Sequence, residues 1–439
     1  MPSPAWLTLN DTSGQHTSSW YAATAHGAPE RRTASHGGDV DVCVIGAGYT
    51  GLNAALELAA RGYDTLVLEA HRVGWGASGR KGGQVGSGHW LEQPALEAWL
   101  GDAHAQALWR LSEAAKARVK HLLAEYAIDC DLRSGTIYVA HRARLEPHYR
   151  SLVAHLHDRY SYQSVRFLDK PAARDLVRSE DVQCAMLDED AAHLHPLDFA
   201  QGVAAAVERA GAHIFERSPV SAVNRCKDHV TVETRGATFK AQRVVLACNG
   251  YLDGLYPRAN RYVQRHNSFI AATEPLGEAR AAEFITPRLA VCDLRFVVNY
   301  FRMSPEHRLL FGGGEGYGTR FPPPPDLAGL VRKRMLQLFP ELDEVAIDYA
   351  WGGTLGITPR RMPYFSRVGG QVYIAGGFSG HGVALVMLAG ALCARAIDGD
   401  TEDFDCIAAV PSGRFPSSAM ARAALMNVAL RLGAWRDRW

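Results

Sequence analysis

A glycine-rich turn near the N-terminus has the spacing that brings a backbone close to a phosphate. Gly46-Ala47-Gly48-Tyr49-Thr50-Gly51 follows the apolar run Val40–Ile45, which predicts a buried strand, and precedes the helical stretch Leu52–Arg61. Gly46 would permit the tight turn, Gly48 would let N–H groups approach a pyrophosphate, and Gly51 would let helix and strand pack closely. The chemistry that this turn predicts is dinucleotide binding.

An acidic residue ends the next predicted strand, Thr65–Leu68. Glu69 stands where a carboxylate accepts hydrogen bonds from an adenosine ribose, which argues against a cofactor with a 2′-phosphate. The alternative is an ordinary glycine turn in a strand–helix–strand unit. The turn, both strands, the helix and the acid occur together, and this combination favours the dinucleotide site.

A second glycine-rich stretch, Gly74–Gly88, reads GWGASGRKGGQVGSG. So many glycines predict a loop that lies against something fitting closely to backbone. Near the other end of the chain, a strand at Val372–Ala375 leads into the turn Gly376–Gly382 and a helix at Val383–Ile397. A nicotinamide enzyme would continue with further strand–helix units, whereas a long cofactor held by both ends of the chain fits FAD better.

The elements between these motifs predict an interleaved architecture. We expect an α/β FAD-binding Rossmann-like domain of the glutathione-reductase type, interleaved with an α+β substrate domain built on a mostly antiparallel sheet. The expected FAD-binding domain comprises 39–130, 190–255 and 350–410, and the substrate domain comprises 131–189 and 256–349. Residues 1–38 form a lead-in that Trp6, Trp20 and Tyr21 could anchor, 91–127 is strongly helical, and 411–439 forms a C-terminal tail helix.

Bulk composition excludes several partner classes. Lys and Arg number 47 against 46 Asp and Glu, so the chain has no overall field for nucleic acid or acidic membranes. Eight scattered cysteines without a Cys-x-x-Cys pair predict buried free thiols and, with no signal peptide, a cytoplasmic protein. His193 and His195 lack further ligand-type neighbours in sequence, so we expect no metal.

Four blocks of the sequence resemble the glycine oxidase, sarcosine oxidase and D-amino acid oxidase family of FAD enzymes. They are DVCVIGAGYTGLNAALELAARGYDTLVLEA, GWGASGRKGGQ, RVVLACNGY and IAGGFSGHGV. The chain is most similar to the γ-glutamylputrescine oxidase subgroup, through GASGR-x-GGQ and through NYFR followed by RLLFGGG.

The resemblance implies three sets of cofactor contacts. The loop from Gly76 would pass the pyrophosphate toward the flavin ring, Ala247 to Asn249 would lie near the nucleotide, and the turn from Phe378 would cover the flavin's pyrimidine end. The positive end of the helix there would stabilise an anionic reduced flavin. The full expected set is Gly46, Ala47, Gly48, Tyr49, Thr50, Gly51, Glu69, Ala70, Arg72, Gly76, Ala77, Ser78, Arg80, Lys81, Gly82, Gly83, Gln84, Val220, Ala247, Cys248, Asn249, Gly250, Gly377, Phe378, Gly380, His381, Gly382 and Val383.

Departures from the sarcosine-oxidising members narrow the substrate. Those members follow GFSGHG with an aromatic residue and a lysine that clamps the substrate carboxylate, whereas this chain has Val383 and Ala384. We therefore expect an amine remote from any carboxylate rather than a simple α-amino acid. Arg302 or Arg361 could replace the clamp; alternatively, either is a solvated or ion-paired arginine.

Two further departures concern oxygen and the flavin link. The lysine that helps oxygen react in sarcosine-type oxidases aligns with Leu310, and Lys81 could replace it electrostatically or be a plain surface lysine. No cysteine precedes Thr358-Pro359, where those enzymes attach the flavin, so noncovalent FAD is expected.

These observations predict oxidation of a primary or secondary amine, such as γ-glutamylputrescine. Hydride transfer to flavin N5 would give an imine that hydrolyses to an aldehyde, and oxygen would reoxidise the flavin and form peroxide. Tyr300, Arg302 and Trp351 are candidates for the substrate face, since aromatic rings hold amines; each could instead be domain core. His381 is the best titratable candidate near the flavin, with structural hydrogen bonding as the alternative.

Two other functions stay open at this stage. One is a dehydrogenase for an amino acid or N-methyl amine that passes electrons to a quinone or another acceptor. The other is a non-catalytic flavin-bound subunit. The apolar, arginine-containing tail could dock on its own domain, contact a partner, or lie on a membrane surface.

Overall fold

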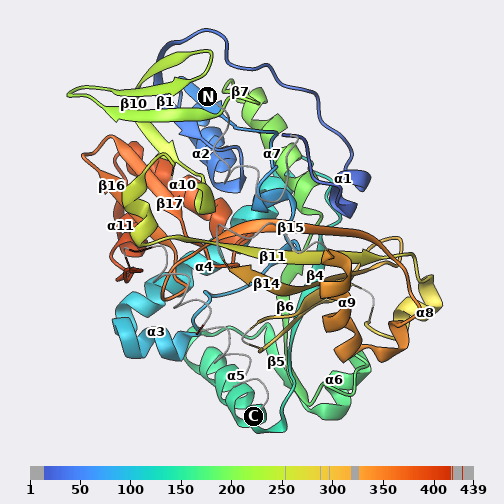
Figure 1. Ribbon diagram of the computed structural model, residues 1–439. Helices are drawn as coiled ribbons and strands as arrows, with labels where there is room; N and C mark the ends of the chain where they lie inside the picture. The colour runs from blue at the N-terminus through green and yellow to red at the C-terminus, as the bar shows by residue number, and fades with distance from the viewer. Residues whose placement is uncertain are drawn as a thin grey trace.

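The computed structural model describes residues 14–252, 254–286, 288–295, 297–317, 326–416, 418 and 428. Trp6 and almost all of the predicted tail helix lie outside these residues. Figure 1 shows two sheets, one beside the helices α2 and α10 and the other crossing the middle of the molecule. Within the described part, no helix combines the length and apolar character needed to cross a membrane.

The first sheet holds the glycine turn. Its order is β16-β17-β10-β1-β2-β7, and the four strand pairs between β17 and β7 in this order are parallel. The hairpin β8–β9 extends β10 antiparallel, and β16 pairs antiparallel with β17. The strands are β1 Gly38–Ile45, β2 Thr65–Leu68, β7 His213–Phe215, β8 Val220–Arg225, β9 Val230–Thr234, β10 Thr238–Leu246, β16 Tyr364–Val368 and β17 Val372–Gly376.

The second sheet is mostly antiparallel and has the order β15-β11-β14-β13-β12-β4-β6-β3, with β5 paired to β6. Only the β12–β4 pair within it is parallel among the described residues. Its strands are β3 Gln84–Val85, β4 Arg133–Ala140, β5 Val165–Leu168, β6 Cys184–His193, β11 Gln264–Thr273, β12 Ala290–Asp293, β13 Tyr300–Met303, β14 Leu309–Tyr317 and β15 Ile347–Ile357. The predicted fold class, a Rossmann-like unit interleaved with a mostly antiparallel one, is confirmed.

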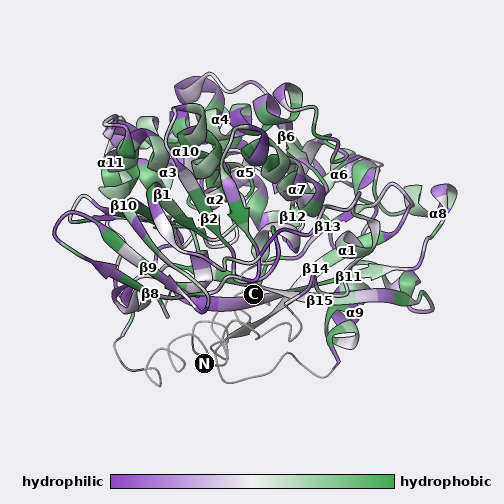
Figure 2. Ribbon diagram, turned by 90° about the horizontal axis from the view of Figure 1, so that it is seen from above, coloured by the Kyte–Doolittle hydropathy of each residue, from purple (hydrophilic) through white to green (hydrophobic). Residues whose placement is uncertain are grey.

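Helices α2, α4 and α10 lie on one face of the first sheet, whereas α5, α6 and α9 pack on strands of the second sheet. Seen from above in Figure 2, α2, α4 and α10 lie on one side of β1 and β10, and the β8–β9 hairpin lies on the other. The helices are α1 Trp20–Thr24, α2 Tyr49–Ala60, α3 Gln93–Leu100, α4 Asp102–Glu125, α5 Glu146–Tyr160, α6 Lys170–Leu176, α7 Pro196–Arg209, α8 Glu278–Ala282, α9 Leu327–Leu338, α10 Ala384–Ile397 and α11 Glu402–Ala408.

Helices α2 and α10 pack closely enough to bring their N-termini to the same edge of the sheet. Thr50 Oγ1 donates to the carbonyl of Val386 at 3.0 Å, and Asn53 Nδ2 donates to that of Met387 at 2.6 Å. A Cβ on Gly390 would lie 2.3 Å from the Thr50 carbonyl oxygen, so only glycine permits this approach. Two positive helix ends therefore face one region.

The structure corrects several local expectations. The helical stretch 91–127 is two helices, α3 and α4, because Gly101 adopts φ +84° between them. The loop 74–88 contains a short strand, β3, that pairs with β6. All eight cysteines are free, but Cys226 is exposed rather than buried. The anchoring role expected of Trp20 and Tyr21 is confirmed, since they are 3% and 0% exposed.

Candidate cofactor and active site

A cavity of about 940 Å³ opens where the two sheets meet. It begins at the carboxyl ends of β1 and β2, passes the N-termini of α2 and α10, and continues between β4, β13 and α5. Carboxyl ends of parallel strands are the usual place for a ligand in such a sheet.

The glycine turn forms the first part of the cavity wall. Gly46 has φ +106°, a left-handed conformation that favours glycine, and a Cβ there would lie 3.0 Å from the Ala247 carbonyl. A Cβ on Gly48 would lie 2.9 Å from Ser78 Oγ, which accepts a hydrogen bond from the Tyr49 N–H at 3.1 Å. The loop that carries Ser78 is thus docked on the N-terminus of α2.

Glu69 lines the cavity at the end of β2. Its carboxylate accepts hydrogen bonds from the Ala47 N–H at 2.7 Å and the His71 N–H at 2.9 Å. Burial, opposed by these hydrogen bonds and reinforced by Glu216, raises the pKa of Glu69 to about 7. A hydroxyl donor from a ligand would favour the charged carboxylate.

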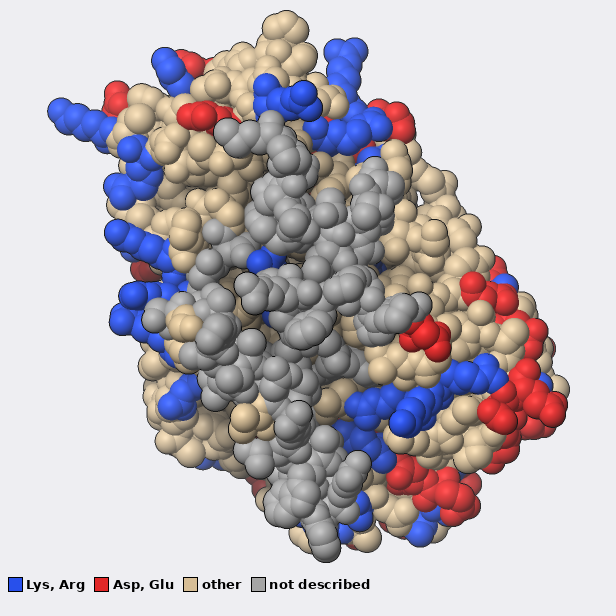
Figure 3. Space-filling view, in the orientation of Figure 1, with Lys and Arg blue, Asp and Glu red and all other residues tan. Residues whose placement is uncertain are grey.

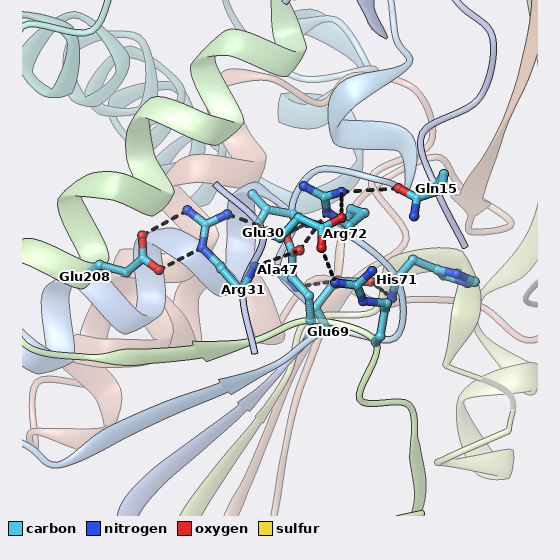
Figure 4. Close-up of polar contacts among 11 residues, drawn as sticks. Gln15, Glu30, Arg31, Ala47, Glu69, His71, Arg72 and Glu208 are labelled. Carbon is cyan, nitrogen blue, oxygen red and sulfur yellow. Dashed lines mark hydrogen bonds and ion pairs between the residues drawn. The ribbon is translucent and has the colours of Figure 1, made fainter. Parts of the chain in front are cut away.

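Arg72 forms its ion pairs with acids other than Glu69. Its Nε lies 2.6 Å from Glu216, a buried acid that also pairs with Arg31. Figure 4 shows Arg72 and Arg31 in one polar network with Gln15, Glu30 and Glu208. Arg72 is therefore not among the described residues that line the cavity, although the sequence analysis predicted it to contact the cofactor.

The loop from Arg80 to Gln84 lines the next part of the cavity and is held from behind. Trp351 Nε1 donates to the Arg80 carbonyl at 2.8 Å, and Arg302 Nε donates to the Gly82 carbonyl at 3.2 Å. Trp351 and Arg302 are 1% and 3% exposed and do not line this cavity. The structure thus places both behind the loop, where Trp351 fits its alternative as core.

Lys81 and His381 meet at the N-terminus of α10. The Lys81 ammonium donates to the Gly382 carbonyl and lies 4.3 Å from the Tyr49 ring centroid. Burial lowers the pKa of Lys81 well below its usual range and also lowers the pKa of His381. Lys81 is therefore no plain surface lysine, and His381 is neutral at pH 7.

Tyr300 is the predicted substrate-face residue that does line the cavity. Its hydroxyl lies 3.1 Å from Ser268 Oγ. At another point of the wall, a Cβ on Gly86 would lie 3.2 Å from the Tyr138 hydroxyl and 3.4 Å from His381 Cε1. Tyr138 is thus the tyrosine that lies beside His381, and Tyr300 lines the same cavity.

Sequence reasoning missed a buried polar network on the far wall. Lys116 Nζ donates to Ser87 Oγ at 2.7 Å, to the Tyr162 hydroxyl at 2.9 Å and to Asp190 at 2.7 Å. Tyr162 and Ser87 both donate to Asp188 at 2.6 Å. These residues come from four separate segments, and no local spacing signals their meeting.

The remaining predicted contacts divide into two groups. Residues that line the cavity include Ala70, Gly76, Ala77, Val220, Ala247, Cys248, Asn249, Phe378, Gly380, Gly382 and Val383. Ala47, Gly51, Gly250 and Gly377 do not line the cavity. Asn249 also has a structural part, because its Oδ1 accepts from the Gly377 N–H at 2.9 Å.

The cavity wall suits a long dinucleotide. It combines a glycine cradle, two helix N-termini and one carboxylate, and the buried Nε1 of Trp75 and Nε2 of His381 have no hydrogen-bond partner among the described residues. His193 and His195 are engaged separately, with the Arg288 carbonyl at 2.9 Å and Asp198 at 2.9 Å.

A family model described as FAD dependent oxidoreductase matches residues 41–396. The chain belongs to this family. It is 37% identical to a probable oxidoreductase OrdL of Rhizobium meliloti (strain 1021), covering 96% of this chain and 97% of the relative. It is 36% identical to the gamma-glutamylputrescine oxidoreductase of Escherichia coli (strain K12), covering 97% and 99%.

Two solved structures share the fold of this chain. Glycine oxidase from Geobacillus kaustophilus superposes with a TM-score of 0.70 at 21% identity, covering 82% of this chain and 95% of that one. L-proline dehydrogenase from P. horikoshii gives 0.68 at 20% identity, covering 85% and 96%. The cofactor of this chain is FAD, and the chain is an oxidoreductase enzyme, which removes the non-catalytic alternative.

Proposed function

We propose that this enzyme oxidises a primary or secondary amine, γ-glutamylputrescine or a similar polyamine-derived amine, with noncovalently bound FAD. The observation that carries the substrate class is the pair Val383 and Ala384 at the start of α10. Both line the cavity, where sarcosine-oxidising relatives carry the carboxylate clamp. The gamma-glutamylputrescine oxidoreductase that is 36% identical over nearly the whole chain supports the same class.

The residues around His381 suit a neutral amine. Tyr300 and Tyr138 offer aromatic surface, and the neutral His381 offers a nitrogen that can hold a proton released by the substrate. Hydrolysis of the imine product would give an aldehyde and release the amine or ammonia. FAD, when bound, would accept the hydride and pass two electrons to oxygen.

The test is anaerobic reduction across an amine panel. γ-Glutamylputrescine, putrescine, sarcosine, glycine and D-alanine are each mixed with the enzyme, and the loss of the flavin's visible absorbance is followed. We expect γ-glutamylputrescine to reduce the enzyme fastest. Fastest reduction by sarcosine or D-alanine would contradict the inference from Ala384.

The second candidate is a dehydrogenase that passes electrons to a quinone or another acceptor. It is favoured by Leu310, which stands in place of the oxygen-related lysine and is 3% exposed in a cluster with Tyr21 and Trp351. Oxygen uptake with stoichiometric peroxide supports the oxidase; turnover only with an artificial acceptor supports the dehydrogenase.

Noncovalent attachment is tested separately. The stretch 351–357 in β15 has no thiol, so acid precipitation should release all of the FAD into the supernatant. Yellow colour that stays with the precipitated protein would contradict this part of the proposal.

A further inference from the structure

A half-buried arginine and an exposed tryptophan line the same cavity beyond the amine end. The guanidinium of Arg361 lies 5.1 Å from the Trp90 ring centroid. Trp90 is 43% exposed, which is unusual for so large an apolar side chain and places it at the cavity's opening. The ring fixes the direction of the guanidinium without neutralising its charge.

Arg361 has no acidic partner among the described residues, unlike Arg295, which also lines the cavity. Arg295 lies 2.7 Å from Asp293 and also pairs with Asp181. No carboxylate among the described residues forms an ion pair with Arg361. A partly desolvated cation facing a cavity is stabilised by an anion, so an anionic group of the ligand is the fitting partner.

The other charged groups at this end leave the balance positive. Glu92 lies 3.0 Å from His148 Nε2, and this contact raises the pKa of His148. Arg144 lines the cavity as well, and it forms no ion pair with a described residue. At this end of the cavity, Glu92 is thus already paired with His148, whereas Arg144 and Arg361 have no acidic partner among the described residues.

The two ends of the proposed site lie close together along the chain. A Cβ on Gly86 would lie 3.4 Å from His381 Cε1, and Trp90 follows four residues later. Because Gly88, at φ +68°, bends the segment between them, the two backbone positions are less than about 14 Å apart, the length of four extended residues. In γ-glutamylputrescine about ten single bonds separate the terminal amine from the carboxylate, which gives roughly 12–13 Å, because three such bonds advance about 3.8 Å.

We propose that Arg361, held against Trp90, binds a carboxylate at the end of the substrate opposite the amine that is oxidised. The substrate class is therefore an amine with a remote carboxylate, such as a γ-glutamyl amide of a diamine. This inference rests on the proposed amine oxidation. It adds the carboxylate as the group by which the enzyme would select among amines.

The test compares three amines that share the reacting end. γ-Glutamylputrescine has both the remote carboxylate and the α-amino group, N-glutarylputrescine keeps only the carboxylate, and N-(4-aminobutyl)-4-aminobutanamide keeps only the amino group. Arg361→Asn removes the charge and suits the backbone, because φ at Arg361 is +62° and asparagine tolerates the left-handed region. In this variant the charge-assisted hydrogen bonds between the guanidinium and the substrate carboxylate are lost. The KM for γ-glutamylputrescine and for N-glutarylputrescine should therefore rise on the order of 10- to 100-fold, while kcat changes little.

The same variant should leave KM for the amide without a carboxylate unchanged. Arg361→Lys should recover part of the lost affinity. The matched control is Arg360→Asn, because Arg360 is exposed, lies 4.4 Å from the Trp99 ring and is outside the cavity. Calorimetry with N-butyl-γ-glutamylamide, which lacks the terminal amine, reports binding to the holoenzyme without turnover.

The outcomes separate the two proposals. If Arg361→Asn weakens all three amines equally, or weakens none, the remote-carboxylate site is refuted while amine oxidation stands. If the wild-type enzyme oxidises none of the three, the proposed function fails and this inference falls with it. Selective loss for the two carboxylates, with unchanged FAD content, supports both.

Discussion

Glu69 shows how a single side chain can connect the glycine turn to a ligand. Its carboxylate joins the Ala47 and His71 amides, and it forms no ion pair with a described residue. Sequence spacing found Glu69 and the glycines because their roles are local: the turn, the strand end and the helix start lie within one strand–helix–strand unit.

The first prediction concerns cofactor affinity at this residue. Glu69→Ala removes the acceptor for the ribose and leaves two buried N–H groups without a partner, so the Kd for FAD should rise about 10- to 100-fold. Glu69→Gln keeps one acceptor and should cost less. FAD binding to apoprotein, followed by fluorescence quenching, measures both. Equal Kd values for wild type and Glu69→Ala would exclude the ribose contact.

The second prediction concerns Lys81 and oxygen. Because burial lowers the pKa of Lys81, its positive charge is present at lower pH and is lost as the pH rises through that lowered value. The rate of reoxidation by oxygen should therefore fall with rising pH in the wild type. Lys81→Met should slow reoxidation about tenfold or more and remove this pH dependence.

Stopped-flow mixing of the reduced enzyme with oxygen measures that step alone. The anaerobic reduction rate of the same variant serves as the internal control, because it does not involve oxygen. An Lys81→Met enzyme that reoxidises at the wild-type rate would assign Lys81 a purely structural contact with Gly382.

Residues that meet only through the fold escaped sequence reasoning. Tyr138 and Asp188 belong to neighbouring strands of the second sheet, and Trp90 follows β3, yet all three line one cavity. Arg302 and Trp351 were predicted to face substrate from their types alone. Their positions behind the flavin loop depend on the register of β13 and β15, which no local pattern determines.

At the scale of elements, the N-terminal segment is part of the site's support. Tyr21 in α1 is fully buried, lies 5.5 Å from the Trp351 ring and 5.9 Å from the Arg302 guanidinium, both measured from its ring centroid. Those two side chains hold the carbonyls of Arg80 and Gly82. A segment outside both sheets thus supports the flavin loop from behind.

The third prediction follows from this packing. Tyr21→Ala should lower the free energy of unfolding by about 3–5 kcal/mol, the usual cost of removing a buried aromatic ring. The same variant should lose more FAD on dilution, because the Tyr21 ring supports the loop from Arg80 to Gln84 through Trp351 and Arg302. Urea unfolding and the FAD content after gel filtration measure the two effects. Tyr21→Phe keeps the ring and should stay close to wild type; an equal loss in both variants would contradict the packing argument.

The bounds of the parallel strands were largely predictable from their short apolar runs, whereas the expected helix 91–127 is divided at Gly101. The expected strand Thr65–Leu68 matches β2, and Val372–Ala375 lies within β17. The domain boundaries depend on which strands pair, a property that short-range sequence patterns do not determine. The division into 39–130, 190–255 and 350–410 against 131–189 and 256–349 stays a prediction.

At the scale of the whole molecule, Lys and Arg number 47 against 46 Asp and Glu, and the pH response depends on a few buried groups. On the face shown in Figure 3, Lys and Arg are frequent along the left edge, and Asp and Glu gather at the lower right beside further Lys and Arg. Burial lowers the pKa of His89 to about 4 and that of His193 to about 3. Both are neutral in the folded protein at pH 5, whereas an unfolded histidine with a pKa near 6.5 is protonated there.

The fourth prediction is that these histidines make the fold sensitive to acid. Since the unfolded chain binds more protons, stability falls as the pH drops below about 6.5, by about 2 kcal/mol per histidine at pH 5. Glu69 acts in the opposite direction, because its raised pKa stabilises the fold at low pH and this contribution is lost as the pH rises toward 7. The test therefore compares, between wild type and variants, the change in unfolding free energy from pH 7 to pH 5.

His193→Gln retains a donor for the Arg288 carbonyl and cannot be protonated, and His89→Gln does the same toward Leu108. In each variant, the loss of unfolding free energy between pH 7 and pH 5 should shrink by about 2 kcal/mol relative to wild type. Replacing the exposed His213 with Gln should leave that loss unchanged. Urea unfolding at both pH values measures the difference. Identical pH dependence in wild type and both buried-histidine variants would show that other groups control the acid response, because the neutral state of these two rings would then contribute nothing to it.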